Sequence, residues 1–311
     1  MKLYNAGIYT ANFNIGGTLW ERLNENEKWQ RLKAGEGNLL ESFHYIGRQR
    51  SVDSIRNDQR QVFLDSGAFS MWSLGAKVDI EAYCQYIQRN EDIIRKDGNS
   101  ILASVMDAIG DDLGTYQNQK RMEKLGVTPL PCFHFNEDIR YLKYYIDNYE
   151  YITLGGMVAQ TTQALLPWLD EIWGKYLTDA HGRPKVKVHG FGLTTPILMR
   201  RYPWYSVDSS SWVQIARVGG MLLLPEAKVL NVSSQSPNRR VEGQHITTLN
   251  EPQRLAVLEK LQKCGVDTDR MQETYLSRWT YNMWAFNELG KMIAAEKGND
   301  PKFIPDQQGL F

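Results

Sequence analysis

Short apolar runs recur along the chain, and most are followed by a polar or helix-like stretch. Eight such runs lie at residues 2–9, 39–46, 62–69, 101–109, 128–135, 151–158, 186–192 and 205–210. Helical patterns lie between them at 81–94, 115–125, 136–148, 161–176 and 196–201. Strands that alternate with helices are typical of a parallel sheet. The pattern predicts an α/β fold, specifically a (β/α)8 TIM barrel, although the second run could equally be the tail of a helix.

The last ninety residues follow a different pattern. Residues 222–250 are rich in loops with strand-like pieces, and two helical patterns follow them. The first, 252–264, places Leu255, Leu258 and Leu261 on one face. The second repeats apolar residues at helical spacing, namely Leu276, Trp279, Met283, Phe286, Leu289 and Ile293. We therefore predict a barrel core at 1–221, a small appended segment at 222–250, and C-terminal helices at 251–311 that pack on the barrel, with the end of the chain along the surface.

Composition limits the classes of partner and compartment. The chain has 311 residues, 42% of them hydrophobic, and 36 basic residues balance 36 acidic ones. A neutral chain has no overall field for a polyanion, so any nucleic acid must be held by a local patch. Cys84, Cys132 and Cys264 form no CxxC pair, which argues against a disulfide framework and a cysteine-rich zinc site. With no signal-peptide pattern at the start and no apolar run of ~20 residues, we predict a soluble cytoplasmic protein.

Polar residues stand where the predicted strands end. In a barrel these ends face one mouth, so their side chains can meet. They are Asp65, Ser66, Asp107, His134, Gly155, Gly156, His189 and Asp208. Carboxylates gathered in a partly desolvated pocket shift apart in pKa, so that one stays ionised as a nucleophile while another holds a proton as an acid. Such a pair suits chemistry at a sugar carbon through an oxocarbenium-like transition state.

Each of these residues also has a purely structural interpretation. Asp65 could form a turn before Gly67, and Asp107 could belong to the start of the next helix. Lone histidines are more often satisfied core residues than catalysts, and the glycine pair could only make a tight strand exit. The basic residues Arg48, Arg50, Arg56 and Arg60 are typical of a solvated face, yet they lie just before the 62–69 run, near the predicted mouth. The constellation favours function more strongly than any single member.

Five motifs carry a resemblance to a known family. LDSGAFS, PLPCFHFNED, YITLGGMV, HGFGLT and YPWYSVDSSSW follow one another within residues 62–220. In this order and spacing the chain resembles the guanine transglycosylases, and within them the DNA-acting DpdA branch of bacterial genomic islands and phages. The resemblance implies a (β/α)8 barrel that exchanges guanine in DNA for a free 7-deazaguanine base such as preQ0, without ATP or a redox cofactor. It places the protein in a bacterial or phage-infected cytoplasm.

The resemblance also implies roles for individual residues. Asp208 matches the nucleophile that attacks C1′ and forms a covalent intermediate, and Asp65 matches the general acid/base, with Ser66 and Gly67 shaping the pocket. Asp107 matches the carboxylate that reads the guanine edge. The remaining matches in the base pocket are Gly155, Gly156, Met157, His189, Gly190 and His134, which stands where the tRNA enzymes have a glutamine. Arginines expected to hold phosphates are Arg200, Arg201, Arg217, Arg239 and Arg240.

The chain departs from the tRNA-acting branch in one respect. Residues 222–248, after the last predicted strand, contain His245 but no cysteine, so the zinc site of those enzymes is not expected, and no other metal is predicted. Three alternatives stay open: a tRNA-guanine transglycosylase, a metal-dependent barrel hydrolase, and a non-catalytic protein that binds nucleic acid. The hydrolase would use His134, His189, Asp107 and Asp208 as metal ligands.

Overall fold

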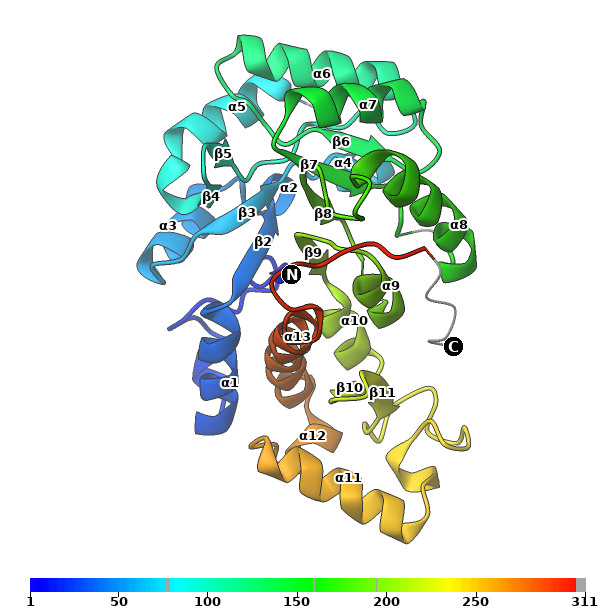
Figure 1. Ribbon diagram of the computed structural model, residues 1–311. Helices are drawn as coiled ribbons and strands as arrows, with labels where there is room; N and C mark the ends of the chain where they lie inside the picture. Colours follow the sequence, from blue (N-terminus) through cyan, green and yellow to red (C-terminus); the bar gives the residue numbers. More distant parts are fainter. Residues whose placement is uncertain (76–78, 159, 194, 306–311) are drawn as a thin grey trace.

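A seven-stranded parallel sheet forms the centre of the molecule (Figure 1). The computed structural model describes residues 1–75, 79–158, 160–193 and 195–305. The strand order is β3-β2-β1-β9-β8-β7-β6, and the register between neighbours is parallel throughout. The strands are β1 (Lys2–Ala6), β2 (Asn38–Ser42), β3 (Val62–Asp65), β6 (Cys132–His134), β7 (Tyr151–Gly155), β8 (Lys187–Gly190) and β9 (Ser206–Ser209). The prediction of an α/β fold with a parallel sheet is confirmed, and all carboxyl ends lie at one edge of this sheet.

The predicted run at 101–109 connects the two edge strands of the sheet. On the β3 side, the Leu64 N–H donates to the Leu102 carbonyl at 2.8 Å and the Ser104 N–H donates to the Leu64 carbonyl at 2.9 Å. On the β6 side, the Val105 N–H donates to the Leu130 carbonyl at 3.0 Å, and the Leu130 N–H donates to the Ala103 carbonyl at 2.8 Å. These are isolated parallel bridges and not a continuous strand. The sheet is therefore curled, with its edges brought close to a shared segment.

Alternation along the strands separates an inner from an outer apolar layer. The inner cluster contains Tyr4, Ala6, Leu40, Phe63, Leu102, Leu130 and Tyr151. Their neighbours Leu3, Leu39 and Leu64 belong to the larger core beneath the helices. At the amino ends of the strands a short hairpin, β4 (Lys96–Asp97) and β5 (Ser100–Ile101), places Asp97 within 2.8 Å of Lys2 and 2.7 Å of Lys187. This ion pair network lies at the end of the sheet opposite the candidate site.

Helices surround the sheet (Figure 1). They are η1 (Trp20–Arg22), α1 (Glu25–Gly35), α2 (Phe43–Ile46), α3 (Gln49–Asn57), α4 (Ala68–Ser73), α5 (Ile80–Arg89), η2 (Glu91–Ile93), α6 (Asp112–Lys124), α7 (Ile139–Asn148), α8 (Thr162–Ile172), η3 (Trp173–Leu177), α9 (Pro196–Arg201) and α10 (Ser211–Arg217). The five predicted helices are present, α9 with the predicted bounds. The apolar pattern did not predict α1, because this helix buries the polar side chains of Glu27, Gln30 and Arg31.

The C-terminal part follows the prediction for one helix and departs from it for the other. A hairpin of β10 (Gly220–Leu223) and β11 (Lys228–Asn231) precedes η4 (Ile246–Thr248), α11 (Glu251–Lys263), α12 (Arg270–Glu273) and α13 (Tyr275–Lys297). The apolar stripe of α13 packs against α1, α10 and β1, as predicted. The predicted packing of the leucine face of α11 holds only in part, because this helix is peripheral: Leu261 is buried and Leu258 is partly buried, but Leu255 is 56% exposed.

The C-terminal end of the chain packs into the core. Phe303 is buried and stacks on Tyr202 with ring centroids 5.5 Å apart, so the tail is anchored in the core at this point and does not only follow the surface. The predicted path of residues 306–311 lies outside the described residues.

Within the described ranges, no helix has both the length and the apolar character that crossing a bilayer demands. The three cysteines are free thiols.

Candidate active site

Three aspartates converge at the carboxyl ends of the strands. Asp65 ends β3 two residues after Phe63, and Asp208 lies in β9 two residues after Ser206, so both share the inner face of the sheet. Asp107 follows the segment that connects β3 and β6. Burial, together with the charges of Asp107 and Asp208, raises the pKa of Asp65 to about 7. The structure thus brings the three carboxyl groups into one electrostatic unit, in which the raised pKa favours the protonated form of Asp65.

The turn after β3 fixes the Asp65 carboxyl group. Its Oδ2 atom accepts a hydrogen bond of 3.0 Å from the Gly67 N–H, and Ser104 Oγ lies 3.5 Å from its Oδ1 atom. Gly67 has a φ of 77°, and a Cβ there would lie 2.5 Å from Ser42 Oγ. Only glycine fits this left-handed position beside a neighbouring strand. Ser66 is fully buried and its hydroxyl accepts from the Ala68 N–H, so it shapes the turn and does not face the open site.

Asp208 is held by a backbone amide and lies beside a buried imidazole. Its Oδ1 atom accepts a hydrogen bond of 2.7 Å from the Gly192 N–H and lies 3.3 Å from His189 Nε2. His189 Nδ1 lies 2.6 Å from Ser206 Oγ, which lies 2.6 Å from the Tyr151 hydroxyl. Burial lowers the pKa of His189, although Asp208 opposes this shift, and the ring is therefore neutral. His189 and these hydroxyl groups form a polar column that supports Asp208 from within the sheet.

Two residues predicted to contact the base lie elsewhere. His189 has no exposed surface and packs between Phe63 and Phe191, so its neighbours are Asp208 and the core, not the open site. Gly190 is buried against Trp204, where a Cβ would lie 3.0 Å from the indole ring. Its lack of a side chain lets the strand pack closely against Trp204, in the loop between α9 and β9. The position of a residue at a strand end did not show whether that residue is buried in the core or exposed at the rim of the site.

His134 stands in an acidic environment next to Asp107. Its Nε2 atom lies 3.4 Å from Asp107 Oδ2 and 3.5 Å from Cys132 Sγ, and its Nδ1 atom lies 2.8 Å from Glu137 Oε1. Burial alone lowers the pKa of His134, but the neighbouring Cys132 and Asp107 raise it and determine the net upward shift. The ring is therefore an imidazolium between two carboxylates. Sequence reasoning missed Glu137 and Cys132, although their spacing of +3 and −2 from His134 places both within reach of it.

The glycine pair after β7 gives His134 the space it occupies. A Cβ on Gly155 would lie 2.7 Å from His134 Cδ2 and 2.9 Å from Cys132 Sγ. Gly156 is exposed with a φ of 72°, and its backbone forms part of the rim. Met157, predicted to line the base pocket, is 2% exposed and belongs to the apolar core. The pair therefore has the structural role of a close strand exit, with one backbone unit open to solvent.

An exposed aromatic cluster lies on α4, directly after the Asp65 turn. Phe69 is 60% and Trp72 is 61% exposed, with ring centroids 6.0 Å apart. Tyr45, on the neighbouring α2, is also exposed, and its hydroxyl lies 3.3 Å from Ser70 Oγ. Exposed aromatic side chains gathered in one place mark interaction surfaces. Sequence reasoning missed this cluster, although AFSMWS directly follows the acidic motif.

The predicted phosphate-binding arginines divide into two groups. Arg200 and Arg201 lie in the last turn of α9, which has returned to the amino-terminal end of β9 and therefore lies far from Asp208. Each is paired with a carboxylate, Arg200 with Glu296 at 2.7 Å and Arg201 with Asp170 at 2.8 Å. Their prediction as mouth residues was wrong, because a helix that follows a strand runs back along the outside of the sheet. The other three, Arg217, Arg239 and Arg240, are exposed, and none forms an ion pair within the described part of the chain.

One group in the site has the donor set of a metal centre. The ligand atoms of Asp107, Cys132 and His134 all lie within 4.8 Å of one another. Carboxylate, thiolate and imidazole are all zinc ligands, and three protein ligands leave a fourth position for water or substrate. Asp107 Oδ1 is buried and has no hydrogen-bond partner among the described residues. This group differs from the set considered for the hydrolase, because His189 is directed to Asp208 and Cys132 takes its place.

Known proteins give no independent identification. Neither the scan against protein-family models nor the search of curated proteins found a match to this chain. The function has to be argued from the geometry of the site and from the motifs that place its residues.

Proposed function

We propose that this protein is a DNA-guanine transglycosylase, which exchanges guanine in DNA for a free 7-deazaguanine base such as preQ0. The observation that carries the proposal is the shared site of Asp65, Asp107 and Asp208, with the pKa of Asp65 raised to about 7. Two neighbouring carboxyl groups in different protonation states supply a nucleophile and an acid, as glycosyl transfer requires. The activity needs no cofactor, and we place it in the cytoplasm of a bacterium or of a phage-infected host.

The same proposal includes a closed (β/α)8 barrel, with 102–105 as the strand between β3 and β6. Two findings support closure. Backbone hydrogen bonds leave this segment toward both edges of the sheet. Side chains from β1, β2, β3, β7 and the connecting segment also share one inner cluster, as expected when a sheet closes on itself. A closed barrel would direct all the strand ends, and so all three aspartates, into one mouth.

The proposed reaction has two displacements at C1′. Asp208 attacks C1′, the bond from C1′ to guanine N9 breaks, and protonated Asp65 gives its proton to the departing base. In the second step N9 of the 7-deazaguanine attacks C1′, the ester bond to Asp208 breaks, and ionised Asp65 takes the N9 proton. The Gly192 N–H, 2.7 Å from Asp208, keeps the nucleophile in place during both steps. Each step is a substitution at one carbon, so configuration is retained overall.

The base would be read by a donor and an acceptor side by side. Guanine presents its O6 acceptor next to the N1–H and 2-amino donors. The Asp107 carboxylate can accept from those donors, and the His134 imidazolium, 3.4 Å away, can donate to O6. Adenine presents the opposite order and would meet like groups. This pair supports a guanine-type substrate, and it gives His134 a role that a glutamine amide could also fill.

Access to C1′ requires that the nucleotide leave the base stack. The exposed Phe69, Trp72 and Tyr45 around the acidic site are suited to stack with unpaired bases. DNA rather than tRNA is favoured because residues 222–248, which follow β9, contain no cysteine. Their single histidine, His245, is already bonded to Ser233 and Thr247, which leaves no set of donors there for a zinc ion.

The direct test offers labelled preQ0 to the protein with DNA and, in parallel, with tRNA. We expect label in DNA, detected by mass spectrometry of released nucleosides, and none with Asp208→Asn. Label in tRNA alone would make the protein a tRNA-guanine transglycosylase. Label in neither polymer, with an intact fold and free guanine released from neither, would refute the proposal.

A metal-dependent hydrolase is the second candidate, and the Asp107, Cys132 and His134 group favours it. In that case a bound ion would occupy the space assigned above to the guanine edge. Metal analysis of the purified protein separates the two functions. Stoichiometric zinc or iron that is lost in Cys132→Ser, together with hydrolysis and no base exchange, would favour the hydrolase. Exchange that persists after chelation would exclude it.

A further inference from the structure

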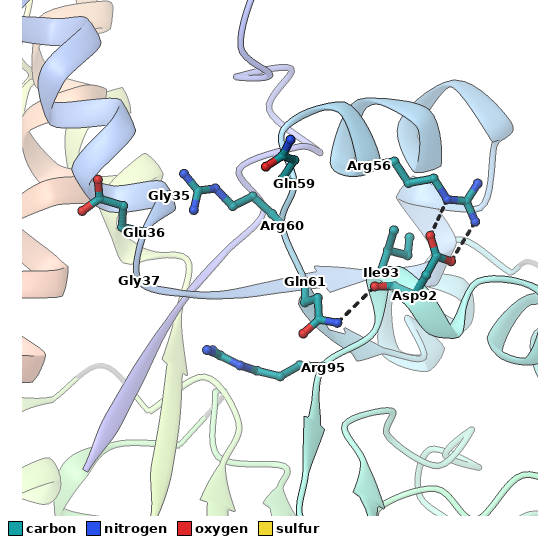
Figure 2. A pocket seen from close by; sticks show the side chains of 10 residues that line it. All are labelled: Gly35, Glu36, Gly37, Arg56, Gln59, Arg60, Gln61, Asp92, Ile93 and Arg95. Atoms are coloured by element: carbon teal, nitrogen blue, oxygen red, sulfur yellow. Dashed lines mark hydrogen bonds and ion pairs between the residues drawn. The ribbon is translucent and has the colours of Figure 1, made fainter.

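A hollow lies at the opposite end of the sheet from the acidic site. It has a volume of about 650 Å³, within the range of ~300–1,000 Å³ that is usual for small-molecule sites. Its walls come from the stretches that lead into β2 and β3 and from residues 92–95, beside the start of β3 (Figure 2). Gln61, in the lining of the hollow, directly precedes β3, and Asp65 is the last residue of that strand. The whole length of β3 therefore separates the two sites. The hollow is therefore a separate feature.

Three arginines line this hollow beside the carboxylates of Glu36 and Asp92, and the arginines are not equivalent. Arg56 forms a two-pronged ion pair with Asp92, at 2.6 and 2.9 Å. Arg60 and Arg95 have no carboxylate partner in the part of the chain that the structure describes. Figure 2 shows these two side chains extending toward the Gly35–Gly37 stretch, whereas Arg56 turns to Asp92. Arg95 donates through Nη1 to Asn38 Oδ1, so its remaining N–H groups and the Arg60 fork are left for a ligand.

The positive charges of Arg60 and Arg95 are energetically unfavourable in these surroundings. Arg60 Nε is buried and has no hydrogen-bond partner among the described residues. A third guanidinium lies behind them: Arg31 is 1% exposed, and its nearest carboxylate is Asp58 at 3.5 Å. A Cβ on Gly35 would lie 2.5 Å from Arg31 Nη1 and 3.9 Å from Arg60 Nε, so both groups crowd one glycine. A buried donor without a partner and several close cations call for an anion.

We propose that this hollow binds a small phosphorylated anion of the pyrophosphate class, held between Arg60 and Arg95. Two planar forks that approach from different loops match a multiply charged phosphoryl group better than a single carboxylate, which one fork can saturate. Ile93 is the only apolar side chain among the lining residues, so the hollow offers no surface for a base or another large apolar group. This site is independent of the proposed base exchange and stands if that function is wrong.

Calorimetric titration with inorganic pyrophosphate, in a phosphate-free buffer, tests the site. We expect one site per chain in the unmodified protein, and affinity reduced by roughly tenfold or more in Arg60→Gln and in Arg95→Gln. Arg89→Gln is the matched control, because Arg89 is an exposed arginine of α5 outside the hollow, and it should bind as the unmodified protein does. Arg60→Lys keeps the charge but loses the fork, and should bind with intermediate affinity.

Several outcomes would overturn the assignment. They are absence of binding at millimolar pyrophosphate, affinity in Arg60→Gln and Arg95→Gln that is unchanged from the unmodified protein, or a loss in Arg89→Gln as large as in these two variants. A single-stranded oligonucleotide that displaced pyrophosphate from this site would also overturn it, in favour of a nucleic-acid contact. Thermal unfolding of each variant without ligand identifies a loss caused by misfolding, and Arg60→Lys then carries the comparison.

Discussion

Asp208 Oδ1 accepts a hydrogen bond of 2.7 Å from the backbone N–H of Gly192. An asparagine at 208 could accept the same bond through its amide oxygen but could not form an ester with C1′. We therefore expect Asp208→Asn to fold normally and to lose base exchange by roughly 10³-fold or more. Exchange of labelled guanine in DNA measures the rate, and a covalent adduct with DNA on a denaturing gel should be absent. A variant that kept the adduct would remove Asp208 from the role of nucleophile.

The raised pKa of Asp65 makes both activity and stability depend on pH. The proposed first step needs its proton, so the rate of guanine release should fall as pH rises through about 7. An unperturbed aspartate titrates near ~3.9, so between about pH 4 and pH 7 the folded protein binds more protons here than the unfolded chain does. The free energy of unfolding should therefore decrease as pH rises across this window. Chemical denaturation at several pH values and the pH profile of exchange check the two effects.

Glu41 provides a control for this dependence on pH. It lies on β2, accepts hydrogen bonds from Tyr9 and Thr10, and has a pKa that burial raises to about 7. Glu41→Gln and Asp65→Asn should both reduce the pH slope of stability. Only Asp65→Asn should abolish the fall in the rate of guanine release near pH 7. If Glu41→Gln abolished that fall and Asp65→Asn kept it, the general acid would have been assigned to the wrong carboxyl group.

The acidic site could be located from sequence because its residues follow a rule of position. Asp65 and Asp208 end buried apolar runs, and the ends of parallel strands lie at one edge. What the pattern could not predict was orientation. His189 occupies the same kind of position but is directed into the core, where it touches Asp208 and Ser206. The prediction for the arginines of α9 was wrong for a related reason. A helix that follows a strand runs back along the sheet, so its last turn lies at the opposite end.

Segments with weak apolar periodicity could also not be predicted from the sequence. Helix α1 is anchored by buried polar groups, and Gln30 bonds to the Cys264 carbonyl 234 residues away. Such partners come from distant parts of the chain, so no local pattern contains them. The exposed aromatic residues of α4 were missed for the opposite reason, because Phe69 and Trp72 look like core residues until the fold places them on the surface.

His134 offers a test of base recognition. His134→Ala removes the charged donor beside Asp107, and we expect the KM for the free base to rise by roughly 10- to 150-fold, the loss of one charge-assisted hydrogen bond of about 1.5–3 kcal/mol. His134→Gln keeps a donor and should recover most of this loss. Steady-state kinetics with varied preQ0 separates KM from kcat. Equal kinetics of the alanine and glutamine variants would show that His134 has no direct contact with the base.

Trp72 tests whether the aromatic residues beside the acidic site engage the polymer. Stacking of one base on an aromatic side chain contributes about 1–3 kcal/mol, so Trp72→Ala should weaken binding of single-stranded DNA by roughly 5- to 150-fold. The KM for the free 7-deazaguanine should change little, because Trp72 is 61% exposed and the base would bind beside the buried aspartates. Trp29→Ala is a matched control: Trp29 is also exposed, but it lies on α1, next to Trp284 of α13. Fluorescence anisotropy of a labelled oligonucleotide measures the affinity of each variant. Equal losses at positions 29 and 72 would indicate a non-specific effect of removing a tryptophan, and the aromatic cluster would then have no assigned part in binding DNA.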